Sequence, residues 1–248
     1  MIYDDTQEHA LEEENYFVSM TDLMVGLVFI FIILLMYYVV QFKKETQELS
    51  GANTTRAEIL EELKKTLKEQ GVQIEVDQDN GILRLPSAIL FDSGNAQLSE
   101  EGRQNVRKLA EALLDVLPCY AVMAEEAKWK GDRACLGTHK IESVYIEGHT
   151  DSDPVTNVNF IKDNWDLSVM RATNTYREML RGVPELEYVQ VEKYSLHKQV
   201  IIRETIMSVS GYGPQRPVSE NKDENRRIDL RLIMKMPNPE GENLIKRK

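Results

Sequence analysis

The stretch FVSMTDLMVGLVFIFIILLMYYVVQF, residues 17–42, divides the chain into a short acidic start and a long polar remainder. Its centre, Leu23–Val40, holds 18 consecutive residues without a charge. At a rise of about 1.5 Å per residue, a helix of this length crosses a hydrocarbon core of about 30 Å. Asp22 precedes the run, and Lys43 and Lys44 follow it. The sequence therefore predicts one transmembrane helix with a carboxylate near its first end.

The charge distribution argues for a retained membrane anchor. Residues 1–16 hold six acids and no lysine or arginine, whereas a cleaved signal peptide has a basic start and a short apolar core. We expect these residues to form an acidic tail. The net charge of −11 and the pI near 5.0 argue against nucleic-acid binding, which requires a basic face.

The orientation of the helix is left open by the residues themselves. By the positive-inside rule, Lys43 and Lys44 would place the downstream domain in the cytoplasm. The two cysteines, Cys119 and Cys135, can form one disulfide if the domain faces an oxidising compartment, or remain as two buried thiols.

Residues 43–71 are expected to connect the membrane helix to a folded domain. The polar segment 45–56 is predicted to be a linker, and residues 55–70 to be a helix that Gly71 ends. The apolar residues of this helix recur at helical spacing: Ile59, Leu60, Leu63 and Leu67.

A folded domain is predicted over residues 72–235, followed by a loose tail at 236–248. Its first part is a hairpin of strands 72–76 and 82–85, joined by Asp79-Asn80-Gly81. A helix with an apolar stripe begins after Ser99, and Pro118 stops it.

The second part of the domain alternates strands and helices. A strand is expected at 141–147, a helix at 164–181 with Asn164 as its N-cap, and further strands at 207–211 and 228–234. Segments 119–140 and 183–207 are interpreted as insertions. This order predicts an α+β sandwich with helices on one face of a sheet.

Five blocks in this region resemble the OmpA-like peptidoglycan-binding domain, and they occur in the same order. They are LFDSGNAQL (90–98), IEGHTD (146–151), NWDLSVMRA (164–172), GYGPQRPV (211–218) and NRRIDLRL (225–232). The resemblance covers roughly residues 72–235 and implies an α/β sandwich with a mixed sheet.

The membrane stretch SMTDLMVGLVFIF (19–31) is similar to the single helix of flagellar stator B subunits of the MotB type. The chain lacks a basic N-terminal tail, has a short linker and carries insertions at 118–140 and 183–207. In these features it resembles more closely the B subunit of the Zorya anti-phage defence system.

The resemblance implies a peptidoglycan-anchored B subunit of an ion-driven motor in the bacterial inner membrane, with the proton as the expected ion. It implies a multi-helix A-type partner of the ZorA or MotA kind, a homodimer and no cofactor. It also implies a cytoplasmic N-terminus and a periplasmic domain. The alternatives are a flagellar-type stator and a passive wall tether without ion transport.

For the membrane helix, the resemblance implies that Asp22 carries the ion, with Thr21 and Ser19 as hydrogen-bond partners. A carboxyl group at this depth is costly when charged, so it must face a partner, a cavity or water. Gly26, one turn further on, permits close helix approach. The alternative is a carboxylate that merely marks the helix end at the headgroups.

For the soluble domain, the resemblance implies that Asp151 and Arg171 bind the ammonium and carboxylate of diaminopimelate in peptidoglycan stem peptides. The alternative is an ion pair between these two residues with a structural role. Thr150 and Asn164 belong to the same blocks and are further candidates.

Two arginines, Arg226 and Arg227, lie in the last block. We expect one of them to line the ligand pocket and the other to brace an acid.

The segment His149-Thr150-Asp151-Ser152-Asp153 could also be interpreted as a metal site, because a histidine and two acids occur at alternate positions. No second histidine or cysteine cluster completes the ligand set. The sequence also lacks a nucleophile elbow, a Walker loop and an HExxH motif. We therefore predict neither a metal centre nor an enzyme, and a metal-dependent cell-wall enzyme is a distant alternative.

Overall fold

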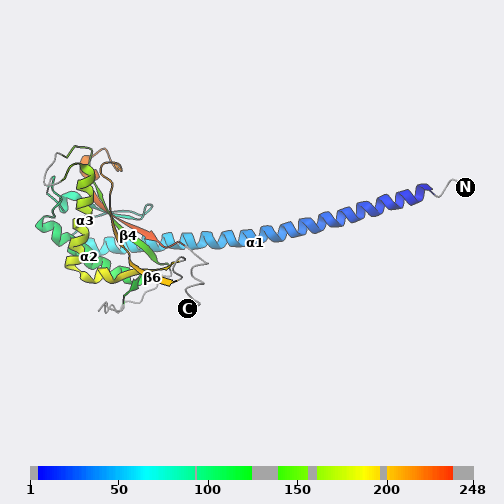
Figure 1. Ribbon diagram of the computed structural model, residues 1–248, viewed down its shortest axis with the longest axis horizontal. Coiled ribbons are helices and arrows are strands. Elements are labelled where there is room, and N and C mark those ends of the chain that lie inside the picture. The colour runs from blue at the N-terminus through cyan, green and yellow to red at the C-terminus, as the bar shows by residue number, and fades with distance from the viewer. Residues whose placement is uncertain (1–4, 93, 125–138, 156–160, 196–199, 237–248) are drawn as a thin grey trace. The chain divides into compact units, whose positions relative to one another are not determined.

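The computed structural model describes residues 5–92, 94–124, 139–155, 161–195 and 200–236, and the chain forms two compact units, Met1–Glu48 and Leu49–Lys248 (Figure 1). The first unit is the beginning of helix α1 (Asp5–Glu69), and its side chains from Ser19 to Lys44 are exposed. Among the described residues, α1 is the one helix that is both long enough and apolar enough to cross a membrane. An exposed apolar surface of this length requires a lipid or protein environment.

The linker expected at 45–56 is instead helical, because α1 continues without a break to Glu69. Gly51 costs a helix interior only about 1 kcal/mol relative to alanine. Ala52 and Thr55 are buried, so packing within the second unit stabilises this segment. The predicted stripe Ile59, Leu60, Leu63 and Leu67 is at most 1% exposed and belongs to the core.

The second unit contains a five-stranded mixed sheet with the strand order β1-β2-β8-β4-β7. The pair β4–β7 is parallel, and the other neighbours are antiparallel. The strands are β1 (Glu75–Asp77), β2 (Ile82–Pro86), β4 (Ile141–His149), β7 (Met207–Gly211) and β8 (Arg227–Met234).

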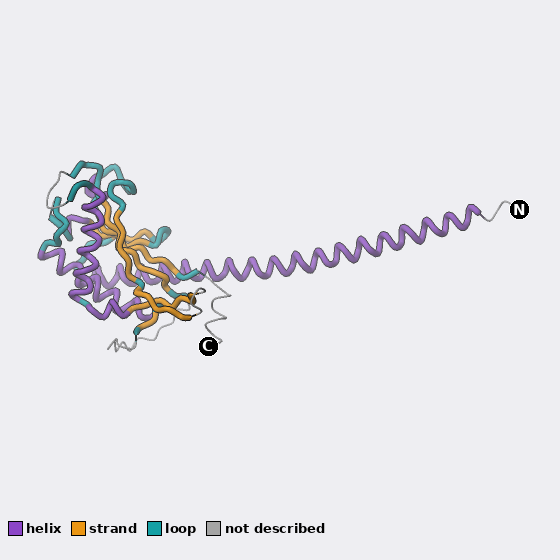
Figure 2. The backbone as a smooth tube through the Cα atoms, in the orientation of Figure 1, coloured by secondary structure: helices purple, strands orange, loops and turns teal. Residues whose placement is uncertain are grey.

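Helices α2 (Glu100–Val116) and α3 (Asn164–Gly182) pack on one face of this sheet (Figure 2). Side chains alternate between the two faces of a strand, so Val144 and Ile146 of β4 join the helices in the core. Ser99 caps α2 by accepting a hydrogen bond from the Gly102 amide at 2.9 Å, as the sequence indicated.

Residues 183–207, predicted to be an insertion, form most of a second sheet of order β3-β5-β6. Its strands are β3 (Val122–Met123), β5 (Val189–Ser195) and β6 (Val200–Thr205). The remaining short elements are the helices α4 (Lys222–Asn225), η1 (Ser87–Ile89), η2 (Leu117–Cys119) and η3 (Pro184–Tyr188).

The predicted fold class is confirmed: an apolar N-terminal helix precedes an α/β domain with helices on one face of a mixed sheet. The strand expected at 72–76 starts later, at Glu75. Gly71 adopts φ = +77°, and the Val72 amide donates to the Leu67 carbonyl at 2.9 Å. Val72 thus closes the C-terminus of α1 before the strand begins.

Because α1 contributes to the core, Leu63→Ala should lower the free energy of unfolding of the domain by about 2–5 kcal/mol. Urea denaturation of the detergent-solubilised chain, followed by tryptophan fluorescence, measures this change. Leu49→Ala is the matched control, since Leu49 lies in the same helix but is 41% exposed, and it should change the stability by less than about 0.5 kcal/mol. Equal effects of the two substitutions would contradict a core role for this part of α1.

Candidate functional site

A pocket of about 290 Å³ opens where the loop after β4 meets the first turns of α3. It is lined by Gly94, Thr150, Asp151, Asp153, Pro154, Val155, Asn164, Leu167, Arg171 and Arg226. Five of the predicted site residues, from three separate sequence blocks, therefore surround one cavity. They are Thr150, Asp151, Asn164, Arg171 and Arg226.

The close packing of α3 on the sheet positions the pocket wall. A Cβ atom on Gly148 of β4 would lie 2.0 Å from the Ser168 carbonyl oxygen, so only glycine permits this approach. Asn164, Leu167 and Arg171 follow one another at helical spacing and all reach the pocket.

Arg171 is the buried cation of the pocket, with only 3% of its surface exposed. Its Nε donates to the Asn95 carbonyl at 2.9 Å, and its guanidinium carbon lies 5.0 Å from the centroid of the Phe91 ring. These contacts fix the orientation of the side chain. Burial, together with the nearby Arg226 charge, lowers the pKa of Arg171 to about 10, so the group is still a cation at neutral pH.

Asp151 is paired with Arg226 rather than with Arg171. Its Oδ2 accepts a hydrogen bond from Arg226 Nη1, and its Oδ1 accepts one from the Asp153 amide at 3.1 Å. Within the described residues, no ion pair joins Asp151 to Arg171. The alternative in which these two residues merely neutralise each other is therefore not what the structure contains.

Asn164 is not the N-cap of α3, contrary to the sequence prediction. The cap is Asp163, whose Oδ1 accepts from the amides of Trp165 and Asp166 at 2.9 and 3.0 Å. Asn164 Nδ2 donates instead to the carbonyls of Asp151 and Asp153 at 3.2 and 2.9 Å. Because the Asp163 carboxylate accepts from the two backbone amides at the start of the helix, the Asn164 side chain is left to hold the pocket loop.

Three buried polar atoms on pocket residues have no hydrogen-bond partner among the described residues: Thr150 Oγ1, Asn164 Oδ1 and Arg171 Nη1. Buried polar groups in proteins are normally paired. Asn164 supplies an acceptor, Arg171 supplies a cationic donor, and the Thr150 hydroxyl can donate or accept, and all three line one cavity. This set favours a polar ligand with both donor and acceptor groups.

Arg226 and Arg227 have different roles. Arg226 lines the pocket, whereas Arg227, the first residue of β8, is not among the residues that line it. Arg227 Nε lies 3.0 Å from both carboxylate oxygens of Asp229. Burial lowers the pKa of Arg227, and Asp229 opposes this shift.

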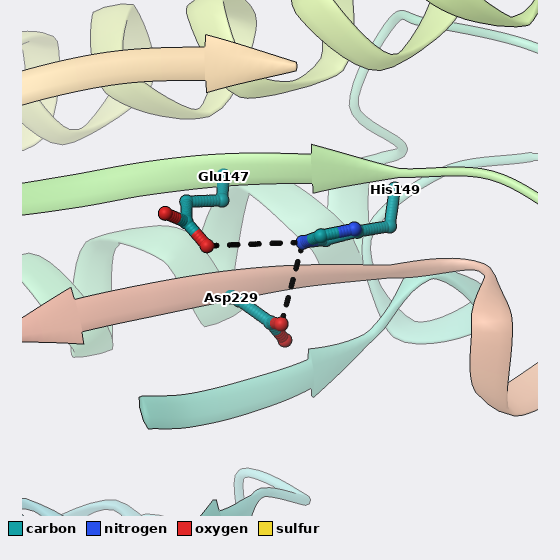
Figure 3. A group of neighbouring side chains, drawn as sticks. All are labelled: Glu147, His149 and Asp229. Carbon is teal, nitrogen blue, oxygen red and sulfur yellow. Dashed lines mark ion pairs between the residues drawn. The ribbon is translucent and has the colours of Figure 1, made fainter. Parts of the chain in front are cut away.

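A second polar cluster, Glu147, His149 and Asp229, lies on the sheet between β4 and β8 (Figure 3). Each of these residues is 1% exposed. His149 Nε2 lies 3.3 Å from Asp229 Oδ2 and 4.0 Å from Glu147 Oε2, and the three ligand atoms lie within 4.8 Å of one another. This spacing alone would suit a metal ion.

The charges of the cluster argue against a metal there. Arg231 donates to both oxygens of Glu147 at 2.9 Å, and Arg227 and Arg84 face Asp229. Arg84 is also paired with Asp77 at 2.7 Å, so three guanidinium groups already balance three carboxylates. A divalent cation would therefore add net positive charge to a buried site whose acids are already paired. Asp151 and Asp153, the other ligands considered from the sequence, line the pocket instead.

Ser19, Asp22 and Gly26 recur at helical spacing and share one face of α1, while Thr21 lies on a different face. All four are exposed. Gly26 has no heavy atom within 4 Å of the position of an added Cβ, so this face is open to close approach by another helix.

Cys119 is buried in η2 and is disulfide-bonded. Cys135, its predicted partner, lies outside the described residues, so the pairing stays a prediction.

Sequence reasoning assigned no role to Phe91 or Asn95, although both lie in the first quoted block and hold Arg171. It also missed Lys222 and Asp223. Their signal was the charged run KDENRR before the last strand, but the spacing of a charged run does not reveal which acid each base meets.

No protein-family model matches the chain. Motility protein B of Bacillus subtilis is 24% identical over 170 residues, which are 66% of this chain and 49% of that protein. The chain therefore spans about half the length of the curated relative it matches.

Among solved structures, the periplasmic domain of Helicobacter pylori MotB is 16% identical, covering 67% of this chain and 82% of that one, with a TM-score of 0.42. The cell wall anchor of the type VI secretion system from Pseudomonas aeruginosa is 18% identical, covering 71% and 97%, with a TM-score of 0.46. These are likenesses of fold only.

If Glu147, His149 and Asp229 form a structural cluster, Asp229→Asn should cost about 3–5 kcal/mol of stability, because it removes the carboxylate partner of the buried Arg227. The midpoint of urea denaturation measures this loss. Glu204→Gln, which removes a half-exposed partner of Lys193, should cost less than about 1 kcal/mol. A midpoint that rises with added Zn²⁺ in the unmutated chain, and not in Asp229→Asn, would contradict this reading.

Proposed function

We propose that the chain is the peptidoglycan-anchored B subunit of an ion-driven motor in the bacterial inner membrane. The observation that supports the anchoring role best is the buried guanidinium of Arg171, which shares a pocket with the Asp151 carboxylate. Its Nη1 has no hydrogen-bond partner in the part of the chain that the structure describes. Such a pocket suits a ligand that presents a carboxylate and an ammonium together.

The free end of the diaminopimelate side chain in peptidoglycan has this chemistry. Its carboxylate would pair with Arg171 Nη1 and accept from the Thr150 hydroxyl. Its ammonium would donate to Asp151 and to Asn164 Oδ1. The three unpartnered atoms of the pocket would then all be satisfied, which is the condition for a stable buried polar contact.

Arg171→Met should weaken binding to purified peptidoglycan by at least about tenfold, because it removes the buried partner of the ligand carboxylate. Co-sedimentation of the detergent-solubilised full-length chain measures this change. Arg177→Met is the matched control, since Arg177 is exposed on the same helix and lies outside the pocket. Unchanged binding by Arg171→Met would rule out the pocket as the wall-binding site.

The motor role rests on α1. We propose that Asp22 carries a proton across the membrane, with Ser19 on the same helix face and Thr21 nearby in the sequence. A single helix cannot enclose an ion path, so the proposal requires a multi-helix A-type partner and a second copy of this chain. Ion flow past Asp22 would then move the partner while the wall holds this chain.

The proposed orientation has the N-terminus in the cytoplasm and the domain in the periplasm, where peptidoglycan lies. The disulfide-bonded form of Cys119 supports this orientation. Lys43 and Lys44 oppose it under the positive-inside rule, but two lysines are a weak signal that a partner subunit can override.

Asp22→Asn should abolish ion conduction and leave assembly with the A-type partner intact, because the amide keeps the shape of the acid but cannot carry a proton. Proton flux into vesicles and co-purification of the partner measure the two properties. Glu45→Gln removes an acid beyond the apolar run and should retain conduction. Full conduction by Asp22→Asn would leave the passive wall tether as the better description.

Within this class we propose a role in Zorya anti-phage defence, supported by the acidic start of the chain and by the additional sheet formed by β3, β5 and β6. A flagellar stator subunit is the second candidate, and the similarity to motility protein B favours it. Genes of phage defence or of flagella beside the coding sequence would separate the two roles.

A further inference from the structure

Arg226 holds the carboxylate that the proposed ligand needs. One of its terminal nitrogens donates to Asp151 Oδ2, and the other donates to Asp223 Oδ1. The guanidinium therefore bridges an acid inside the pocket and an acid at its rim, where Asp223 is 76% exposed. We call this arrangement the Arg226 bridge.

The two arginines of the pocket are held differently. Arg171 is buried and fixed by the Asn95 carbonyl and the Phe91 ring. The side chain of Arg226 is 40% exposed, and its contacts in the described part of the chain are with the two carboxylates. Arg226 can therefore swing toward solvent at little cost, whereas Arg171 cannot.

The negative charge of Asp151 is already paired in this arrangement. Its Oδ1 accepts from the Asp153 amide, and its Oδ2 is held by Arg226. An ammonium that approaches Asp151 must compete with a guanidinium already paired there. Asp223 supplies an alternative partner, so Arg226 can leave Asp151 without becoming unpaired.

We propose that Arg226 competes with the ammonium of the ligand for the Asp151 carboxylate. This inference rests on the proposed function. When the ammonium binds Asp151, Arg226 transfers fully to Asp223. The balance between the two acids sets the affinity of the pocket. It also sets its selectivity, because only a ligand with an ammonium has to displace the bridge.

The test uses two probes with the same seven-carbon dicarboxylate skeleton: meso-diaminopimelate, which carries two amino groups, and pimelate, which carries none. Calorimetric titration of the detergent-solubilised full-length chain gives the affinity for each. Arg226→Gln should bind diaminopimelate about two- to fivefold more tightly, as expected for the loss of a partly exposed ion pair. Its affinity for pimelate should not rise, because a positive charge has been removed.

The reciprocal variant is Asp223→Asn, which removes the alternative partner and should weaken diaminopimelate binding by a similar factor. Arg226→Lys keeps a cation but cannot span both acids as the guanidinium does, so its affinity for diaminopimelate should lie between those of Arg226→Gln and the unmutated chain. Arg216→Gln controls for the change in net charge, since Arg216 is exposed, stacks on Tyr212 at 3.7 Å and lies outside the pocket.

The outcomes separate this inference from the proposed function. If Arg226→Gln binds diaminopimelate equally or more weakly while Arg171→Met still abolishes binding, the competitor role is wrong and the pocket assignment stands. If Arg226→Gln binds diaminopimelate and the unmutated chain does not, the competitor role is supported, with an Arg226 bridge strong enough to block the ligand. Failure of both chains to bind would overturn the competitor and the pocket together.

Discussion

The contact between Gly148 and Ser168 is the constraint on which the pocket depends. A side chain at position 148 would collide with the Ser168 carbonyl, so glycine lets α3 lie directly against β4. Ser168 Oγ also accepts from the Gly213 amide at 3.0 Å, and Gly213 in turn accepts from the Thr150 amide. The helix, the sheet and the pocket loop are thereby fixed relative to one another, and Arg171 is held at a set depth.

Two groups of charged residues that are close in the sequence differ in how completely their charges are paired. On the sheet, Glu147 and Asp229 are satisfied by the arginines around them, which makes that cluster a rigid support. In the pocket, Arg171 has an unpartnered nitrogen, and Asp151 is held by a residue that is 40% exposed. In the cluster the carboxylates are paired, and the buried atoms of its three residues without a hydrogen-bond partner are the two ring nitrogens of His149. The pocket is the site whose charged groups are incompletely or exchangeably paired, as ligand binding requires.

The two parts of helix α1 lie in different environments, the first with exposed apolar side chains and the second in the core of the domain. Its apolar first part has exposed side chains from Leu23 to Phe42, and in the proposed function these face lipid and the partner subunit. Its second part supplies Ile59, Leu60, Leu63 and Leu67 to the core of the domain. The domain therefore includes the end of the helix that carries Asp22, and no separate linker of the expected kind exists at 45–56.

The sequence by itself determined the apolar helix, the strands of the five-stranded sheet and the two helices that cover it, and its resemblance to a known domain pointed to five of the residues that line the pocket. These follow from local periodicity, caps and short blocks, which act over a few residues. The helical state of 45–56 depended on burial of Ala52 and Thr55, which local polarity does not predict. Tertiary structure alone decided that Asp151 pairs with Arg226, that Arg227 braces Asp229 and that Asp163 caps α3. Pairing between distant charges depends on which side chains the packed backbone brings within hydrogen-bond distance, and spacing along the chain does not encode it.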